Sequence, residues 1–429
     1  MSVSQGHWFG HPPGLTILFL TEMWEKFSYF GMRALLVYYM TKELAMPQAQ
    51  ASWIYGTYTA FAYFTPIIGG LIADRFIGRR TAVLLGGSIM AVGHFMMAFE
   101  GLFYPALATI ALGNGLFLPS LPSQVQTLYA ADDPRRITAF NVYYVGINLG
   151  AILAPLICGT LGELYGWHWG FGAAGIGMCI GLAIYIGGSH HLPESVRQVQ
   201  GRDVSATVHS NSFGQRLGLL LGVIAMVVVF RGAYEQIGNT VALWTDSDVD
   251  RGVGTRTIPS TWFQALNPLL VFVLTPLLLW IWRKRMQPGD QLAPARRMAI
   301  GAFIVAASFV MLAVIAQASE AAGVPAHWTW LVLFLLVYTT GELFILPTGL
   351  ALFGNLAPGA VAATSIALWF SASFAGNLLA GALGSWWSRM EHMTFFLLMA
   401  AVAALAATML LLVDRPVRAL LRAADTPRE

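Results

Sequence analysis

Residues 21–33 read T-E-M-W-E-K-F-S-Y-F-G-M-R and lie inside an apolar stretch that covers positions 15–40. Such a stretch is long enough to cross a bilayer, which takes about 20 mostly apolar residues. A single charge at the centre of a bilayer costs at least about 2.5–3.5 kcal/mol. At 100° per residue the charged side chains and Tyr29 fall within an arc of about 100° on one helix face. We therefore expect a polar stripe that faces the interior of a helix bundle. The charged members of the stripe are Glu22, Glu25, Lys26 and Arg33.

The composition places the chain among integral membrane proteins. Of its 429 residues, 57% are hydrophobic and only 10% are charged, whereas a soluble protein carries about 25% charged residues. The formal net charge of +3 is too balanced to indicate binding of nucleic acid. The two cysteines, Cys158 and Cys179, lie in apolar segments and imply no disulfide framework. The sequence contains no H-E-x-x-H, Walker or nucleophile-elbow motif, so we expect no enzyme, no catalytic residue and no bound metal.

Hydropathy predicts twelve transmembrane helices, because twelve stretches reach the length that a span needs. They lie at approximately 15–40, 50–73, 80–99, 103–129, 137–158, 168–187, 217–244, 260–282, 297–318, 327–350, 362–385 and 394–413.

The longest polar stretch, residues 189–216, separates the sixth predicted span from the seventh. It predicts a cytoplasmic linker between an N-terminal bundle of six helices, residues 1–188, and a C-terminal bundle of six, residues 217–429. Basic residues support this topology, since cytoplasmic loops are enriched in Lys and Arg. If both termini are cytoplasmic, 17 of the 24 Lys and Arg lie on the cytoplasmic side and four on the other side. We expect a bacterial inner-membrane protein with both termini in the cytoplasm.

Two six-helix halves and a cytoplasmic linker are the plan of the major-facilitator transporters, in which the substrate site lies between the halves. The segment Gly69–Arg80, G-G-L-I-A-D-R-F-I-G-R-R, resembles the cytoplasmic signature of that superfamily. Its glycines permit close packing of helix ends, and Asp74 with the arginines can lock the cytoplasmic side. The predicted fold is therefore all-α and major-facilitator, with 12 transmembrane helices in two bundles around a central cavity.

Three further ionisable residues lie inside predicted spans: Arg231, Glu235 and Glu342. Arg231 and Glu235 are four residues apart and can pair on one helix face. Ionisable groups within membrane spans mark ion or proton pathways, and the neighbouring Glu22 and Glu25 should titrate as a unit. The alternative is a set of satisfied buried ion pairs without a role in transport.

Seven segments resemble motifs of one family, the proton-dependent oligopeptide transporters. E-M-W-E-K-F-S-Y-F-G-M-R (22–33) resembles its first-helix motif E-x-x-E-R-F-x-Y-Y-G-x-R, and F-N-V-Y-Y-V-G-I-N-L-G-A-I-L-A-P (140–155) resembles its fifth-helix motif F-x-x-x-Y-x-x-I-N-x-G. The other matches are residues 62–75, 234–236, 262–268, 340–350 and 369–377.

This resemblance implies proton-coupled symport of di- and tripeptides by alternating access, with protons as the coupling ion and no other cofactor. It implies short peptides as substrate, a lipid bilayer as surroundings and function as a monomer. It assigns proton coupling to Glu22, Glu25, Lys26 and Glu342. It assigns a gating salt bridge to Arg33 and Glu235, with Arg231 beside them. It assigns the peptide site to Tyr29, Tyr63, Asn148, Asn267, Trp369 and Glu342, which would meet the amino end of the peptide.

The chain departs from the family pattern most clearly at Leu118, where G-L-F-L-P-S (115–120) stands in place of a segment with a lysine. Glu342 thereby loses its expected cation. We hypothesise that Glu342 is protonated at rest and ionises when a substrate ammonium arrives; alternatively, Arg231 or Lys26 replaces the missing cation. The departure also keeps two other functions open: a passive or differently coupled carrier of another small zwitterion, and a substrate sensor without transport.

Overall fold

The computed structural model describes residues 10–130, 132–193, 210–285, 293–356 and 362–425. The chain forms two compact units. Unit 1 comprises Met1–Met46, Phe61–Gln200 and Thr257–Leu269, and unit 2 comprises Pro47–Ala60, Gly201–Arg256 and Leu270–Glu429. The predicted division into halves at a linker stays a prediction, and residues 194–209 of that linker lie outside the described residues.

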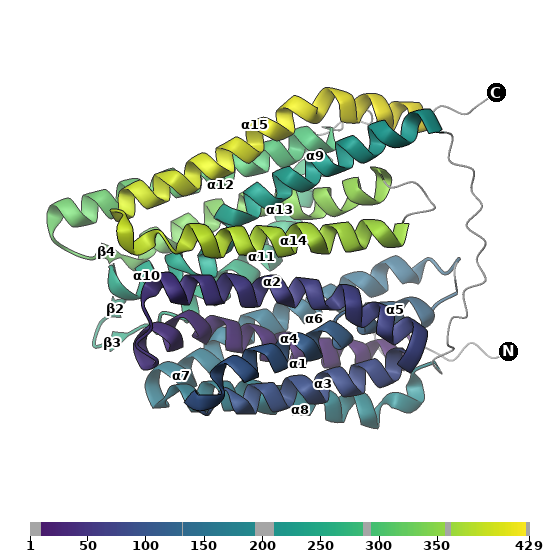
Figure 1. The fold of residues 1–429 in the computed structure, drawn as a ribbon, viewed down its shortest axis with the longest axis horizontal. Helices are drawn as coiled ribbons and strands as arrows, with labels where there is room; N and C mark the ends of the chain where they lie inside the picture. Colours follow the sequence, from purple (N-terminus) through teal and green to yellow (C-terminus); the bar gives the residue numbers. More distant parts are fainter. Residues whose placement is uncertain (1–9, 131, 194–209, 286–292, 357–361, 426–429) are drawn as a thin grey trace. The chain divides into compact units, whose positions relative to one another are not determined.

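The first part of the chain, up to α8, consists of helices joined by short loops among the described residues. In unit 1, α1 packs against α6 and α8, and α3 packs against α4 and α8 (Figure 1). Short π-helical segments extend α1 over Tyr39–Glu43, extend α2 over Ala73–Ile77 and join α6 to α7 over Pro155–Gly159. The helices are α1 (Pro13–Tyr38), α2 (Gln48–Ile72), α3 (Arg79–Met96), α4 (Phe103–Phe117), α5 (Ser120–Thr127), α6 (Arg135–Ala154), α7 (Thr160–Tyr165) and α8 (Trp167–Gly187).

The second part of the chain adds seven helices and four strands of two residues each among the described residues. In unit 2, α12 packs against α13 and α15, and α9 packs against α14 and α15 (Figure 1). β1 pairs in parallel with β4, with Val249 opposite Ala326, and β2 pairs with β3. The elements are α9 (Ser210–Tyr234), α10 (Thr240–Ser247), β1 (Val249–Asp250), β2 (Gly252–Val253), β3 (Arg256–Thr257), α11 (Trp262–Arg285), α12 (Pro294–Ala322), β4 (Ala326–His327), α13 (Trp328–Leu356), α14 (Ala362–Gly384) and α15 (His392–Asp425).

Ten helices among the described residues are long and apolar enough to cross a membrane. The other two predicted spans are α1, which carries the charged stripe, and α3, which begins with Arg79 and Arg80. Many large apolar side chains are exposed along the helices, such as Leu112 at 62% and Leu412 at 74%. Exposed apolar surface of this extent indicates contact with lipid. The all-α, multi-pass membrane fold predicted from the sequence is confirmed.

In each unit, a pair of glycines brings two neighbouring helices into close contact. A Cβ on Gly86 of α3 would lie 2.6 Å from the backbone oxygen of Gly113 in α4. In unit 2 a Cβ on Gly301 of α12 would lie 2.5 Å from the backbone oxygen of Gly341 in α13. Small residues at such positions let membrane helices approach closely. The third and fourth spans of each half therefore pack through the same kind of glycine contact.

Each unit also contains the first part of one helix whose remainder belongs to the other unit. In unit 2 the first part of α2 lies against α14, where a Cβ on Gly56 would come within 2.4 Å of the Gly381 Cα. In unit 1 the carboxylate of Glu163 accepts hydrogen bonds from the backbone N–H groups of Ser260 (2.9 Å) and Thr261 (2.8 Å), just before α11 begins.

Candidate functional site

The charged stripe of α1 forms a buried cluster in unit 1. Lys26 Nζ lies 3.3 Å from Glu22 Oε1 and 2.5 Å from Glu25 Oε2. Glu22, Glu25 and Lys26 are 1%, 0% and 9% exposed. One ammonium therefore serves two carboxylates, and with all three ionised the cluster carries one negative charge in excess. A buried charge without compensation is costly, and one bound proton would remove the excess.

Two carboxylate oxygens of this cluster, one of Glu22 and one of Glu25, have no hydrogen-bond partner among the described residues. The hydroxyl of Tyr143 on α6 lies beside the same two carboxylates. Buried polar atoms are normally paired, so two unpaired carboxylate oxygens next to a hydroxyl mark a position where a proton can be held. Tyr143, which directly precedes the tyrosine of the fifth-helix motif, was not among the predicted site residues.

Close packing of α6 places it against this cluster. A Cβ on Gly150 would lie 2.2 Å from the backbone oxygen of Met23 and 3.0 Å from the Lys26 Cβ. Any larger residue at position 150 would push α6 away from the stripe. The glycine of the fifth-helix motif thus has a physical role beside the predicted substrate residue Asn148.

The other predicted site residues of unit 1 are buried to varied degrees. Tyr29 is buried at 9% exposure and its ring meets that of Phe30 edge to face. Asn148 is 7% exposed and its amide donates a 2.9 Å hydrogen bond to the Tyr144 backbone oxygen. The remaining three predicted residues are half-buried: Arg33, Tyr63 and Asn267.

Arg231 and Glu235 form a buried ion pair in unit 2. Arg231 donates to Glu235 Oε1 at 2.7 Å, and the residues are 5% and 2% exposed. The pair lies where α9 ends at Tyr234 and a 3₁₀ turn over Glu235–Gly238 leads to α10. A Cβ on Gly376 of α14 would lie 2.5 Å from the Arg231 Cβ. The absence of a side chain at position 376 therefore leaves room for Arg231. The i, i+4 pairing predicted from the sequence is present.

Glu342 of α13 is buried at 6% exposure and accepts a 2.8 Å hydrogen bond from the hydroxyl of Tyr234. The Tyr338 hydroxyl in turn donates to the Tyr234 backbone oxygen at 2.5 Å, and the two tyrosine rings stack. Sequence reasoning missed Tyr234 as a partner of Glu342. The available signal was its place in the Y-E-Q segment, residues 234–236, directly before Glu235.

Trp369 of α14, the last predicted residue of the peptide site, is half-buried. A Cβ on Gly349 would lie 3.0 Å from its indole ring, so the tryptophan packs closely against α13. The half-buried Leu118 follows α4 directly.

The predicted residues thus divide between the two units. The structure brings Glu22, Glu25 and Lys26 together in unit 1 and Arg231 with Glu235 in unit 2. Because Arg33 belongs to unit 1 and Glu235 to unit 2, their gating bridge stays a prediction. Within the described part of the chain, no group of three or more His, Cys, Asp or Glu residues is arranged to hold a metal ion.

Comparison with known proteins agrees with these features. The sequence model of the POT family matches residues 80–213 and 206–396. The chain is 34% identical to the "Peptide transporter YePEPT" of Yersinia enterocolitica subsp. palearctica, over 88% of each chain. It is 31% identical to the "Di-/tripeptide transporter" of Lactococcus lactis subsp. cremoris, over 95% of this chain and 96% of that protein. A crystal structure of a peptide transporter POT in complex with sulfate has a TM-score of 0.90 at 29% identity and covers 98% of both chains.

Proposed function

The chain belongs to the POT family and is a multi-pass membrane transporter and not an enzyme, and from that premise we propose that it carries di- and tripeptides together with protons. The observation that carries the proposal is the excess negative charge of the α1 cluster, in which Lys26 faces both Glu22 and Glu25. A buried site with one charge in excess takes up and releases a proton as its surroundings change.

The residues of the proposed peptide site are those that the family resemblance assigned. A dipeptide zwitterion has charged ends about 5–7 Å apart. Arg33 and Lys26 supply positive charge for its carboxylate, and Glu342 supplies negative charge for its ammonium. The amides of Asn148 and Asn267 serve the peptide bond, and Tyr29, Tyr63 and Trp369 accept varied side chains. The names of the two relatives, a peptide transporter and a di-/tripeptide transporter, support this substrate class.

The proposal places the protein in the inner membrane of a bacterium, as a monomer with both termini in the cytoplasm. The distribution of basic residues supports this orientation, because Lys and Arg concentrate in loops that stay on the cytoplasmic side. Arg33, Arg231 and Glu235 gate the site in this mechanism, and alternating access exposes it to one side of the membrane at a time.

Uptake into liposomes tests the proposal. The purified protein is reconstituted, an inward proton gradient is imposed, and the uptake of labelled dialanine is followed over time. We expect dialanine to accumulate above its equilibrium level. Glu22→Gln should lower the accumulated level at least about tenfold, because the amide cannot take up a proton. The same variant should retain exchange of dialanine across the membrane, which needs no net proton movement.

Glu320→Gln is the matched control, since it removes an exposed carboxylate at the end of α12. It should accumulate dialanine as the unchanged protein does. Full accumulation by Glu22→Gln would show that the α1 cluster is not the coupling site.

A second candidate is a passive or differently coupled carrier of another small zwitterion. Leu118 favours it, because the lysine of the family motif is absent at that position. Equilibration of dialanine without accumulation would favour this carrier. Binding of dialanine without flux would favour a substrate sensor.

A further inference from the structure

Unit 1 contains a cavity of about 280 Å³ at the end of α1, where the π-helical segment Tyr39–Glu43 lies near the start of α8. Under the predicted topology this end faces the periplasm. The side chains that matter for its chemistry are Tyr39, Glu43, Glu100, Glu163, Trp167 and His168. None of them belongs to the predicted peptide or proton site.

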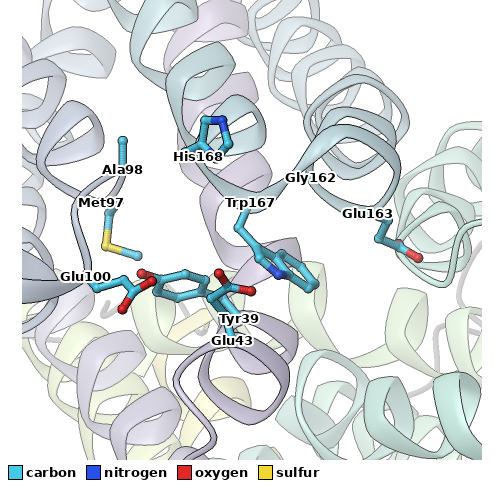
Figure 2. A pocket seen from close by; sticks show the side chains of 10 residues that line it. Tyr39, Glu43, Met97, Ala98, Glu100, Gly162, Glu163, Trp167 and His168 are labelled. Atoms are coloured by element: carbon cyan, nitrogen blue, oxygen red, sulfur yellow. The ribbon is translucent and has the colours of Figure 1, made fainter.

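Two carboxylates of this cavity are available to a ligand. Glu43 and Glu100 are exposed, and neither has a hydrogen-bond or ion-pair partner among the described residues. Glu163 is already engaged with Ser260 and Thr261. Figure 2 shows Glu163 pointing away from the group formed by Tyr39, Glu43 and Glu100.

Tyr39 is the second, independent sign of a ligand. It is 3% exposed, and its ring is held edge to face by Phe171 at 5.0 Å and by Trp167 at 6.3 Å. Its hydroxyl has no hydrogen-bond partner among the described residues, although it is close enough to Glu43 and Glu100 to feel both charges. A polar side chain that is almost fully buried and lines a cavity normally has its hydroxyl paired with a ligand or water.

The chemistry of the walls selects the class of ligand. Two carboxylates attract a cation, and the faces of Tyr39 and Trp167 stabilise an organic cation by cation–π contact. Bound metal ions instead need several oxygen, nitrogen or sulfur ligands at close range, and the described residues contain no such group. The volume of about 280 Å³ is at the lower limit for drug-sized ligands, so the cavity suits one small group.

We propose that this cavity binds an organic ammonium group, with Glu43 and Glu100 as its counter-charges and Tyr39 and Trp167 as its aromatic walls. The group is either a small free amine or the ammonium of a peptide.

Calorimetry on the full chain in lipid nanodiscs tests this site with n-butylammonium as the probe and n-butanol as its neutral counterpart. We expect saturable binding of n-butylammonium and none of n-butanol. The double variant Glu43→Gln with Glu100→Gln should weaken binding at least about tenfold, and Trp167→Leu should weaken it about threefold or more. Glu320→Gln, which removes an exposed carboxylate elsewhere, should leave the affinity unchanged.

Glu342→Gln separates this cavity from the proposed peptide site, because Glu342 belongs to unit 2. The proposal requires that n-butylammonium still binds to this variant with full affinity. It is overturned if binding is not saturable, if it survives loss of both carboxylates, or if it is lost in Glu342→Gln. Failure of dialanine transport in liposomes would leave this binding result unaffected.

Competition in the Glu342→Gln variant distinguishes the two sources of the ammonium. Displacement of n-butylammonium by trialanine, but not by N-acetyltrialanine, assigns the cavity to the amino end of a peptide. Binding of n-butylammonium without displacement by trialanine assigns it to small free amines.

Discussion

At the scale of single residues, hydroxyl groups take positions where charged partners would otherwise be expected. The Tyr234 hydroxyl donates to Glu342, and the Tyr143 hydroxyl lies beside Glu22. A neutral donor orients a carboxylate without neutralising it. Glu342 can therefore remain available to a substrate ammonium although position 118 is a leucine. Neither of the two alternatives that the sequence suggested for Glu342 included Tyr234.

The first prediction concerns Tyr234. Tyr234→Phe removes the donor to Glu342 and should raise the KM for dialanine about ten- to hundredfold, because one lost hydrogen bond to a charged group costs about 1.5–3 kcal/mol. The maximal rate should change less than the KM, since the hydroxyl orients a binding group. Initial rates of uptake over a range of dialanine concentrations measure both.

Tyr338→Phe is the matched control, because it also removes one hydroxyl but leaves the hydrogen bond to Glu342 in place. Its KM should stay within about twofold of the unchanged protein. Equal effects of the two substitutions would contradict a specific role for Tyr234.

The second prediction concerns His11, which joins the segment before α1 to the loop after α5. The His11 ring is 3% exposed and its Nδ1 lies 2.8 Å from the Tyr129 hydroxyl. Arg135 donates to the Gly10 backbone oxygen at 3.0 Å and pairs with Asp133. Burial, and then the charge of Arg135, lower the pKa of His11, while Asp133 opposes them. The folded state therefore favours the neutral imidazole.

The sign of the effect follows from this shift. A histidine whose pKa is lowered by folding stabilises its contacts above the ordinary pKa of about 6.5, and this stabilisation is lost as the pH falls below that value. Amide hydrogen exchange at Gly10, His11 and Gly14, corrected for intrinsic rates, should be faster at pH 5.5 than at pH 7.5. His11→Gln, which cannot titrate, should show no such difference. A pH dependence that persists in His11→Gln would rule out the imidazole as its source.

At the scale of elements, predicted spans contain breaks that hydropathy does not reveal. The predicted span 103–129 consists of α4 and α5, separated at Leu118 and Pro119, where proline lacks the N–H that a continuous helix would use. The predicted span 217–244 breaks after Tyr234, beside the Arg231–Glu235 pair. Discontinuous helices in transporters place backbone and side-chain groups at binding sites. Apolar composition continues through both breaks, so only backbone geometry reveals them.

The third prediction concerns the contact of α2 with α14. Gly56→Ala places a methyl group 2.4 Å from the Gly381 Cα and 2.8 Å from the Asn377 backbone oxygen. Backbone atoms cannot move aside as flexible side chains do, so the substitution should destabilise the protein by about 1–3 kcal/mol. Thermal unfolding in detergent, followed by circular dichroism, measures the loss.

Gly172→Ala in α8 is the control, because nothing lies within 4 Å of its added Cβ. This variant should unfold at the temperature of the unchanged protein or slightly above it, as alanine favours helix over glycine. A Gly56→Ala protein as stable as the Gly172→Ala protein would show that α2 and α14 do not need close contact.

At the scale of the whole molecule, two boundaries between the compact units fall inside helices. Unit 2 contains Pro47–Ala60, the start of α2, and unit 1 contains Thr257–Leu269, the start of α11. Two helices that pass from one unit to the other connect them along the chain in addition to the linker. Alternating access, as proposed above, requires packing contacts between helices to form and break during each cycle.

The fourth prediction tests this requirement for α2 and α14 within unit 2, with a reversible cross-link. A Cβ on Gly384 would lie 3.3 Å from the Ser52 Cβ, close to the separation of about 3.5–4.5 Å in disulfides. Ser52→Cys with Gly384→Cys, in a protein carrying Cys158→Ala and Cys179→Ala, should lose dialanine uptake on oxidation and regain it on reduction. The reduced form of the same protein is its control. Equal uptake by the oxidised and reduced forms would mean that α2 and α14 stay together throughout transport.

The sequence by itself determined the membrane-spanning helices, the inward-facing charged stripe and the family. Hydropathy and the cost of a buried charge depend on a short stretch of sequence. They can therefore be evaluated without knowing which helices pack beside that stretch. The i, i+4 pair of Arg231 and Glu235 was accessible for the same reason, because helical geometry alone brings such residues together. Only the tertiary structure decided that Glu342 meets Tyr234, which is 108 positions away. It likewise decided which helix ends join which unit and where Tyr39 lines a cavity, because these contacts depend on which helices lie side by side.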